Sequence, residues 1–329
     1  MKGQVKIRTD GSSSIGLGHI VRCISLAHMI KDEFDIHFYS LSLPDSLQRE
    51  IKEEGWTVTL INQESDFMAS LNGDEIVVLD GYQFDSGYQK KIKDKGAKLV
   101  CIDDFHDQYF YADLVINHAP GITENEYDGE PYTKYLLGPD YALLRPEFLK
   151  SSNHNKRNFK NVIKNIFICF GGSDPKNLTS KILEWLPQNE FNVTVILGNR
   201  YQHHDDLKNI IRQRKNLVVS VKTSLSAKEI RQEMINADFG IVPASGILFE
   251  IISVNTPAIS GMYMANQFLI YRGFKKKDVF IDVCNFDRNK IASSINRLNG
   301  IKLEQIRENQ KQVIDNRSHI RLASEFRKF

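Results

Sequence analysis

The sequence predicts an α/β protein with two similar halves, each built on a parallel sheet. Short apolar runs alternate with helical patterns along the chain, and each half opens with a strand, a glycine loop and a helix. A polar stretch without periodicity, over 151–158, separates the halves and is expected to be a linker. At 329 residues the chain is longer than one hydrophobic core usually supports, so we expect two domains, over 1–150 and 151–315.

The first half alternates strands and helices as a parallel sheet requires. Strands are predicted over 5–9, 35–39, 57–60, 75–79 and 97–102, and helices over 19–31, 46–54 and 88–95. The runs 75–79 and 97–102 are largely apolar, which is typical of strands buried on both faces. Such sheets bind ligands beyond the carboxyl ends of their strands, where this half carries Asp10, Asp80, Tyr82, Asp103 and Asp104.

The second half repeats this order after a short helix that opens at Pro146. Strands are predicted over 165–170, 192–197, 216–221, 238–242 and 257–260, and helices over 177–186, 227–235 and 250–254. Two of the strands close on glycine loops, 171–175 and 243–246, and a helix follows each loop.

The composition excludes several classes of function. With 43 basic and 41 acidic residues the net charge is +2, so no global field favours a nucleic acid, and the basic run 272–277 is expected to be a solvated turn. No apolar run approaches the ~20 residues of a membrane span, and the amino terminus shows no signal-peptide pattern. We therefore expect a cytoplasmic monomer. The four cysteines are far apart and form no Cys-x-x-Cys pair, which argues against a zinc site and a disulfide framework.

The first glycine loop is the strongest catalytic candidate. It runs from Gly11 to Gly18 with three glycines and three serines, and His19 directly follows the pair Gly16-x-Gly18. No third glycine stands at the spacing of a dinucleotide-binding loop, whereas an imidazole at this point suits acid–base chemistry. The positive end of the following helix favours the neutral, proton-accepting ring. We expect His19 to be a general base, with a structural loop cap as the alternative.

The glycine loops of the second half are candidates for phosphate binding. The residues Gly171, Gly172 and Ser173, and the pair Ser245 and Gly246, precede helices whose N–H groups and dipole can hold an anion. Each loop alone could be merely a tight connection, but two at strand ends favour a diphosphate ligand. Neither loop matches the P-loop of kinases and NTPases. Glu250, on the next helix, would suit ribose hydroxyls, the alternative being a solvated helix glutamate.

Metal chemistry is the weaker interpretation of the acidic residues. Asp103 and Asp104, together with Asp80, could bind a divalent cation, but such clusters are more often hydrogen-bonded to loop amides. The run 203–206 lacks a partner at metal spacing and is expected to be exposed. We expect neither a metal nor a cofactor.

A known signature fits these residues. The chain reads Arg8-x-Asp10-Gly11-Ser12-x-x-Ile15-Gly16-x-Gly18-His19-x-x-Arg22-Cys23-x-x-Leu26-Ala27, and later Val78-Leu79-Asp80-Gly81-Tyr82, Ile102-Asp103-Asp104, Gly138-Pro139-Asp140-Tyr141, Phe170-Gly171-Gly172-Ser173-Asp174, Ala244-Ser245 and Asn266-Gln267. This pattern resembles the UDP-2,4-diacetamido-2,4,6-trideoxy-β-L-altropyranose hydrolases of pseudaminic acid biosynthesis. The match spans roughly the first 270 residues.

The resemblance implies a GT-B fold, like that of the peptidoglycan N-acetylglucosaminyl transferase, with two Rossmann-like domains whose parallel sheets face a cleft. It implies hydrolysis of a UDP-sugar at the anomeric carbon, with C–O cleavage, inversion and release of UDP. His19 then matches the catalytic base. Tyr82 and Asn266, also expected to be catalytic, match positions that contact the sugar or its reacting face. A terminal helix over 316–329 would return to the first domain. The substrate-binding residues expected on all these grounds are Asp10, Gly16, Gly18, Arg22, Asp80, Gly171, Gly172, Ser173, Ser245, Gly246, Glu250 and Gln267.

One departure and two alternatives stay open. Many members carry a histidine where this chain has Gly81, which leaves the identity of the sugar open. A glycosyltransferase of the same fold would need an acceptor surface, and the helix over 46–54 shows no basic amphipathic face. A non-catalytic nucleotide-sugar-binding protein would have no use for His19. One scaffold hosts many activities, so the fold cannot choose among them.

Overall fold

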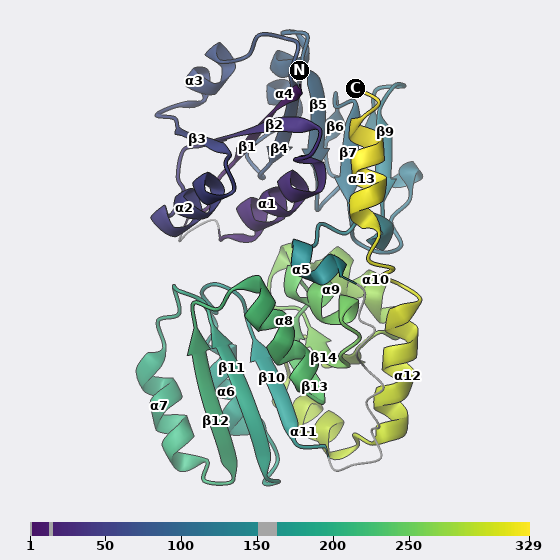
Figure 1. Cartoon of the computed structure of the whole chain (residues 1–329). Coiled ribbons are helices and arrows are strands. Elements are labelled where there is room, and N and C mark those ends of the chain that lie inside the picture. Colours follow the sequence, from purple (N-terminus) through teal and green to yellow (C-terminus); the bar gives the residue numbers. More distant parts are fainter. Residues whose placement is uncertain (1, 13–15, 151–162) are drawn as a thin grey trace. The chain divides into compact units, whose positions relative to one another are not determined.

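The computed structural model describes residues 2–12, 16–150 and 163–329. The chain divides into two compact units: unit 1 holds Met1–Pro146 and Arg317–Phe329, and unit 2 holds Glu147–Asn316. The expected linker over 151–158 lies outside the described residues. Both units carry a parallel sheet with helices, as Figure 1 shows.

Unit 1 is built on a seven-stranded sheet in the order β3-β2-β1-β4-β5-β7-β9, and all of its strand pairs are parallel. The order reverses direction at β1, which is the Rossmann-like arrangement with a topological switch point between β1 and β4. The strands are β1 (Gly3–Thr9), β2 (Phe34–Ser40), β3 (Thr57–Leu60), β4 (Ile76–Asp80), β5 (Lys98–Ile102), β7 (Leu114–Asn117) and β9 (Lys134–Leu137). The short strands β6 (Tyr109–Phe110) and β8 (Asp128–Gly129) pair separately.

The helices of unit 1 include one from the far end of the chain. They are α1 (Gly18–Ile30), α2 (Asp45–Glu53), α3 (Glu64–Ala69), α4 (Ser86–Lys93), the 3-10 turns η1 (Glu124–Glu126) and η2 (Pro139–Tyr141), and α13 (Ser318–Phe326). Helix α13 packs against α1 and η2. Ion pairs from Lys134 to Glu325 at 2.7 Å and from Arg327 to Glu33 at 2.6 Å tie it to β9 and to the start of β2.

Unit 2 holds a six-stranded sheet in the order β12-β11-β10-β13-β14-β15. Its strands are β10 (Asn165–Cys169), β11 (Phe191–Leu197), β12 (Leu217–Thr223), β13 (Phe239–Pro243), β14 (Ala258–Gly261) and β15 (Ile281–Asp282). Its helices are α6 (Leu178–Trp185), α7 (His204–Gln213), α8 (Ala227–Asn236), α9 (Gly246–Ser253), η3 (Ala265–Gln267), α10 (Phe268–Lys275), α11 (Arg288–Asn296) and α12 (Gly300–Lys311), with α5 (Pro146–Leu149) at the boundary between the units.

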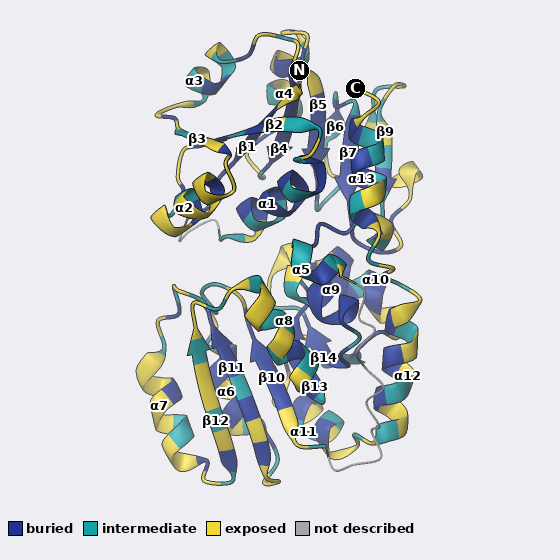
Figure 2. Cartoon of the chain, viewed as in Figure 1, coloured by how far each residue is buried: buried dark blue, intermediate teal, exposed yellow. Residues whose placement is uncertain are grey.

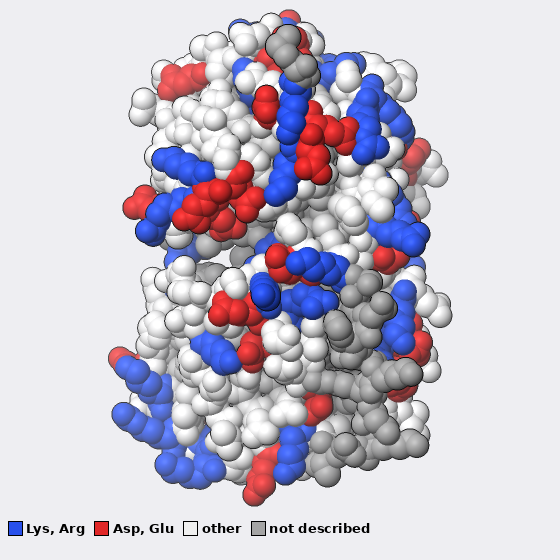
Figure 3. All heavy atoms as spheres, viewed as in Figure 1, with Lys and Arg blue, Asp and Glu red and all other residues white. Residues whose placement is uncertain are grey.

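The central strands form the core of each sheet. All five residues of β4 and of β13 are buried. Burial on both faces explains why their sequences are continuous apolar runs. The edge strand β12, in contrast, has many exposed residues and shows much yellow in Figure 2. At the surface, basic and acidic side chains lie intermixed on the face shown in Figure 3. Among the described residues, no helix combines the length and apolar character needed to cross a membrane.

Candidate active site

The glycine loop of unit 1 delivers His19 to the carboxyl end of the sheet. Gly16 has φ +96°, a region that only glycine adopts without strain, and its N–H donates to the carbonyl of Ser12 at 3.0 Å. A Cβ on Gly11 would lie 2.8 Å from Cγ2 of Ile20, so the absent side chain lets the end of β1 pack against α1. The chain thereby turns into α1, in which His19 is the second residue and is buried.

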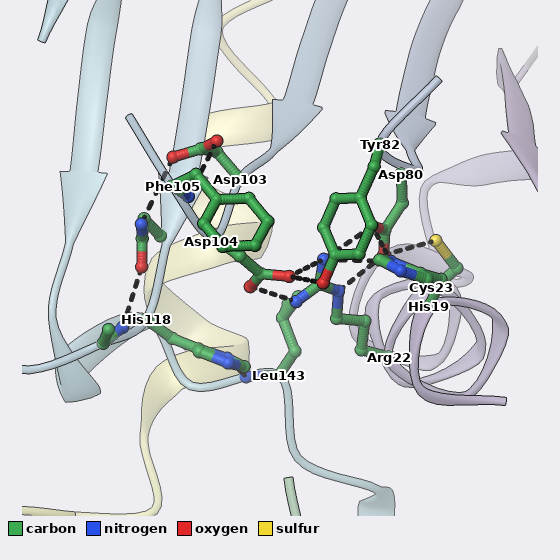
Figure 4. A network of polar contacts seen from close by, with 12 residues as sticks. His19, Arg22, Cys23, Asp80, Tyr82, Asp103, Asp104, Phe105, His118 and Leu143 are labelled. Carbon is green, nitrogen blue, oxygen red and sulfur yellow. Dashed lines mark hydrogen bonds and ion pairs between the residues drawn. The ribbon is translucent and has the colours of Figure 1, made fainter. Parts of the chain in front are cut away.

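His19 is paired with Asp80. Nδ1 of His19 lies 2.7 Å from Oδ1 of Asp80, which is the last residue of β4 and is fully buried (Figure 4). A carboxylate at this distance holds the proton on Nδ1 of the neutral ring, so Nε2 becomes the basic nitrogen. The sequence placed both residues at the same edge of the sheet but did not pair them.

Arg22, one turn further along α1, is held between two carboxylates. Its guanidinium donates to both oxygens of Asp80 at 2.6 Å, and to the oxygens of Asp104 at 2.6 and 3.0 Å. Burial alone would raise the pKa of Asp80, but the charge of Arg22 and the contact with His19 outweigh burial and hold it well below its usual range. The pKa of Asp104 is lowered in the same way, mainly by Arg22.

Tyr82 covers the imidazole. The two ring centroids lie 4.6 Å apart with an interplanar angle of 83°, an edge-to-face contact. The Tyr82 hydroxyl donates to Oδ2 of Asp104 at 2.9 Å, and its ring also contacts Phe105. The side chain is 53% exposed, so a ligand can reach it directly.

The neighbouring residue Gly81 leaves room for Gln83. A Cβ at Gly81 would come within 2.5 Å of the Gln83 amide oxygen, and the Gln83 amide nitrogen donates to Asp10 at 3.0 Å. A larger residue at position 81 would therefore displace Gln83. Gly81 therefore allows Gln83 to reach Asp10 in this chain.

His118 belongs to the same cluster and was missed from the sequence. It directly follows β7, and its Nδ1 accepts the N–H of Leu143 at 3.4 Å. Burial, followed by the charge of Arg22, lowers the pKa of His118 to about 4, so the ring is neutral at pH 7. Its position directly after a strand was the available signal, but the short run 114–117 was not predicted to be a strand.

Asp10 and Asp103 are engaged by the protein itself. Asp10 is buried and accepts hydrogen bonds from Arg8 at 2.8 and 2.9 Å, from Ser40 and from the main-chain N–H of Leu41. These contacts fix the turn after β2, whose Ser42 carbonyl accepts the N–H of Gly11 at 2.9 Å. Asp10 therefore supports the glycine loop in this structure.

Asp103 similarly binds the N–H groups of Phe105 and His106 and the hydroxyl of Tyr127. In the described part of the chain, no group of three or more His, Cys, Asp and Glu side chains is arranged to hold a metal ion. The carboxylates of Asp80 and Asp104 hold Arg22 instead.

The candidate residues of unit 2 follow three adjacent strands. Gly171, Gly172 and Ser173 follow β10, Ser245 and Gly246 follow β13, and Asn266 and Gln267 lie beyond β14. Because β10 pairs with β13 and β13 with β14, all three loops lie at one edge of the sheet.

Each loop of unit 2 is shaped by local contacts. Gly171 has φ +75°, and Asp174 accepts the N–H groups of Leu178 and Thr179 at 2.8 Å, which caps α6. Ser245 is the N-cap residue of α9, and Gly246 is its exposed first residue.

Glu250 and Gln267 are both buried. Because Glu250 is buried although it lies on α9, it is not the solvated helix glutamate of the alternative interpretation. The side-chain amide oxygen of Gln267, Oε1, accepts the N–H of Tyr263 at 2.8 Å and that of Met264 at 3.4 Å, which fixes the loop that exposes Asn266.

No known protein-family profile matches the chain. An uncharacterised protein of Methanocaldococcus jannaschii is 31% identical over 268 residues, which cover 78% of this chain and 55% of that protein. The spore coat polysaccharide biosynthesis protein SpsG of Bacillus subtilis is 25% identical, covering 85% of this chain and 83% of its own length. The UDP-2,4-diacetamido-2,4,6-trideoxy-β-L-altropyranose hydrolase of Campylobacter jejuni is 26% identical, covering 80% and 93%. The chain therefore spans about half of the first relative and most of the other two.

Solved structures identify the fold. MurG of Acinetobacter baumannii aligns with a TM-score of 0.67 at 11% identity, covering 99% of this chain and all of its own. Alr3699/HepE of Anabaena, solved with UDP-glucose, aligns with a TM-score of 0.62 at 11% identity, with the same coverage. The GT-B fold predicted from the sequence is confirmed. The predicted resemblance is also confirmed, because the relatives of the chain include a protein named as that hydrolase.

Proposed function

We propose that the chain hydrolyses a UDP-linked 2,4-diacetamido-2,4,6-trideoxy sugar at the anomeric carbon, with inversion. The pairing of His19 with Asp80 at 2.7 Å carries this proposal, because it provides an oriented base at the carboxyl end of the sheet. The relatives named for this hydrolase and for polysaccharide biosynthesis support a nucleotide-sugar substrate. The product sugar would serve the synthesis of a nonulosonic acid.

The reaction is a single displacement by water. Nε2 of His19 takes a proton from water as its oxygen forms a bond to the anomeric carbon, and the bond from that carbon to the diphosphate oxygen breaks. The electron pair leaves with UDP, and the base later returns its proton to solvent. Because UDP is a stable anion at pH 7, the leaving group needs no proton donor, so one base suffices. Attack opposite the leaving group inverts the configuration.

The remaining residues divide between orienting the base and holding the substrate. In unit 1, Asp80 sets the tautomer of His19, Arg22 holds Asp80 in place, and Tyr82 contacts the sugar with its exposed ring. Gly16 and Gly18 keep the backbone before His19 open to the substrate. Asp10 and Asp80 do not contact the substrate in this proposal. Asp10 acts through the loop that it supports, and Asp80 acts through His19.

In unit 2 the diphosphate binds the loops at Gly171–Ser173 and Ser245–Gly246, whose following helices supply N–H donors. Glu250 is assigned to the ribose hydroxyls. Asn266 contacts the sugar, and Gln267 keeps the Asn266 loop in shape through its two main-chain contacts.

The test is UDP release from the UDP-diacetamido sugar in water enriched in oxygen-18. We expect the label in the free sugar and not in UDP, with the inverted anomer formed first. His19→Gln should lower kcat by about 10²-fold or more, the usual contribution of a general base. No UDP release by the wild-type chain, or a His19→Gln variant that keeps most of the rate, would refute the proposal.

Glycosyl transfer is the second candidate, because the solved neighbours include the glucosyltransferase of Polygonum tinctorium and other GT-B proteins. An oriented imidazole can deprotonate a hydroxyl acceptor as well as water. UDP release that is strongly stimulated by a glycan or lipid acceptor, with the sugar recovered on that acceptor, would favour transfer. A third outcome, tight binding of the UDP-sugar without turnover, would indicate a binding protein.

A further inference from the structure

The buried group around His19 has an unequal number of charges. Arg22 supplies one positive charge, whereas Asp80 and Asp104 supply two negative charges, and all three side chains are largely shielded from solvent. With a neutral His19 the group carries one net negative charge, which a protonated imidazole would neutralise. The group therefore has one carboxylate more than Arg22 alone requires.

Asp104 is the residue that creates this excess. A guanidinium nitrogen of Arg22 lies 3.2 Å from Nδ1 of His19, so the positive charge of Arg22 opposes protonation of the ring. Asp104 binds the same guanidinium through both of its oxygens and offsets that charge. Without Asp104, one carboxylate would have to balance both Arg22 and the imidazolium.

Asp104 also fixes the ring above the base. Its Oδ2 accepts the Tyr82 hydroxyl at 2.9 Å as well as an Arg22 N–H at 3.0 Å, so one oxygen joins Tyr82 to the ion-pair group. Figure 4 shows the Tyr82 ring directed toward Asp104 beside His19. The exposed ring is thereby held edge-on to the imidazole.

Other titratable groups also lie around this site: Cys23 on α1, Cys101 on β5, Asp103 directly after β5, and His118 after β7. Burial raises the pKa of the Cys23 and Cys101 thiols well above their usual values, and His118 is neutral at pH 7. The Asp103 carboxylate binds loop amides and Tyr127. Burial raises the pKa of Asp103, whereas Arg22 lowers that of Asp104, so Asp104 is the more readily ionised of the two neighbours.

We propose that Asp104 is a positioning residue for the base: it neutralises Arg22 so that His19 can hold a proton, and it anchors Tyr82 over the ring. This inference rests on the proposed role of His19. It assigns to Asp104 a different role from the cation ligand considered for it from the sequence. Asp104 itself does not touch the reacting atoms.

The first experiment needs no turnover. The His19 ring signal, assigned by its loss in His19→Gln, is followed by NMR against pH in the wild-type chain and in Asp104→Asn. We expect the midpoint of ring protonation to fall by about one pH unit or more in Asp104→Asn, the effect of losing one nearby negative charge. The matched control is Asp113→Asn, because Asp113 precedes β7 at the opposite edge of the same sheet and pairs with Lys93 and Lys98. That variant should leave the midpoint in place.

Steady-state kinetics separate the two contributions of Asp104, which are its charge and its hydrogen bond to Tyr82. Asp104→Asn should lower kcat about tenfold and move the acid limb of kcat/KM to lower pH. Tyr82→Phe removes no charge, so it should lower the rate without moving that limb. The double variant should lose little more than Asp104→Asn alone, because the Tyr82 hydroxyl acts through Asp104. If Asp104→Asn does not fold, Asp104→Glu keeps the charge and should retain the wild-type limb with a reduced kcat.

An unchanged His19 midpoint in folded Asp104→Asn, or an equal shift in Asp113→Asn, would overturn the proposal. So would fully additive losses in the double variant. If the wild-type chain releases no UDP, the proposed function fails, whereas the NMR titration still decides the role of Asp104.

Discussion

Nδ1 of His19 lies 2.7 Å from a carboxylate oxygen of Asp80, although the two residues are 61 positions apart in the chain. The sheet creates this contact. The register of β4 places Asp80 beside Thr9 of β1 and Ile102 of β5, so the strand ends coincide where α1 begins. The tautomer of the proposed base therefore depends on strand pairing as well as on the glycine loop.

The first prediction concerns this contact. Asp80→Asn replaces an acceptor by a group that can present an N–H to the imidazole, which favours the wrong tautomer and loses the pairing with an imidazolium. We expect kcat to fall about 10²-fold or more, with KM much less affected. Cys23→Ala is the control, because it removes a thiol 3.5 Å from Asp80 and leaves the His19 contact intact. A rate for Asp80→Asn near that of the control would contradict the orienting role.

The second prediction separates two glycines of the first loop. Gly16→Ala must adopt a positive φ and should cost about 1–2 kcal/mol of folding free energy, measured by urea unfolding. A Cβ on Gly18 meets no atom within 4 Å in the described part of the chain, so Gly18→Ala should fold with nearly wild-type stability. If the substrate approaches this backbone closely, Gly18→Ala will raise KM. An unchanged KM would remove Gly18 from the binding residues.

Much of this arrangement was predictable because it depends on local patterns. The apolar run of β4 and the glycine turn before His19 are features of a few consecutive residues, and parallel strands bring their carboxyl ends together. Hence Asp10, Asp80, Tyr82, Asp103 and Asp104 were placed at one edge. Helix α7 was missed because its first residues, His204 and Asp205, indicate only an exposed polar surface.

The different contacts of the acidic residues were not predictable from the sequence. Asp10 is satisfied by Arg8 and by the turn after β2, and Asp103 by Tyr127, which are contacts that only the folded chain creates. Asp80 and Asp104 differ because Arg22 reaches both of them from α1. His118 was missed for a related reason: β7 is four residues long, and its neighbour β9 is equally short. A strand of four residues shows too few alternating buried and exposed positions to be recognised from the sequence pattern.

The third prediction tests the phosphate loop at α9. Aspartate is a favourable N-cap residue, so Ser245→Asp should not destabilise unit 2, yet its charge would repel a diphosphate at the same helix end. We expect the Kd for UDP, measured by calorimetry, to rise about tenfold or more. Asn299→Asp provides the matched control, because Asn299 is the N-cap of α12 in the same unit and accepts the Lys302 N–H, as an aspartate would. Equal affinities in the two variants would place the diphosphate elsewhere.

The fourth prediction concerns stability at acid pH. The folded chain lowers the pKa of His118 from 6.5 to about 4, so between these values the unfolded chain binds more protons than the folded chain. Stability must therefore fall as pH drops from about 6.5 to about 4, by about 3 kcal/mol from this residue, and no further below that window. His118→Asn keeps an acceptor for the Leu143 N–H and cannot titrate. The free energy of unfolding of this variant should therefore fall less steeply between pH 6.5 and about pH 4.

Urea unfolding of both proteins at pH 7.0, 5.5 and 4.5, values chosen to span this window, isolates the contribution, because other groups cancel in the difference. The carboxylates of Asp80 and Asp104 do not interfere: their pKa values are lowered below 3.8, so the stability that they provide is lost only at pH below the His118 window. Parallel pH dependence of the two proteins between pH 7.0 and 4.5 would mean that His118 can be protonated in the folded chain. A protonated His118 would place a second cation beside Arg22. The charge balance proposed for the group around His19 assumes that His118 is neutral, so that balance would have to be revised.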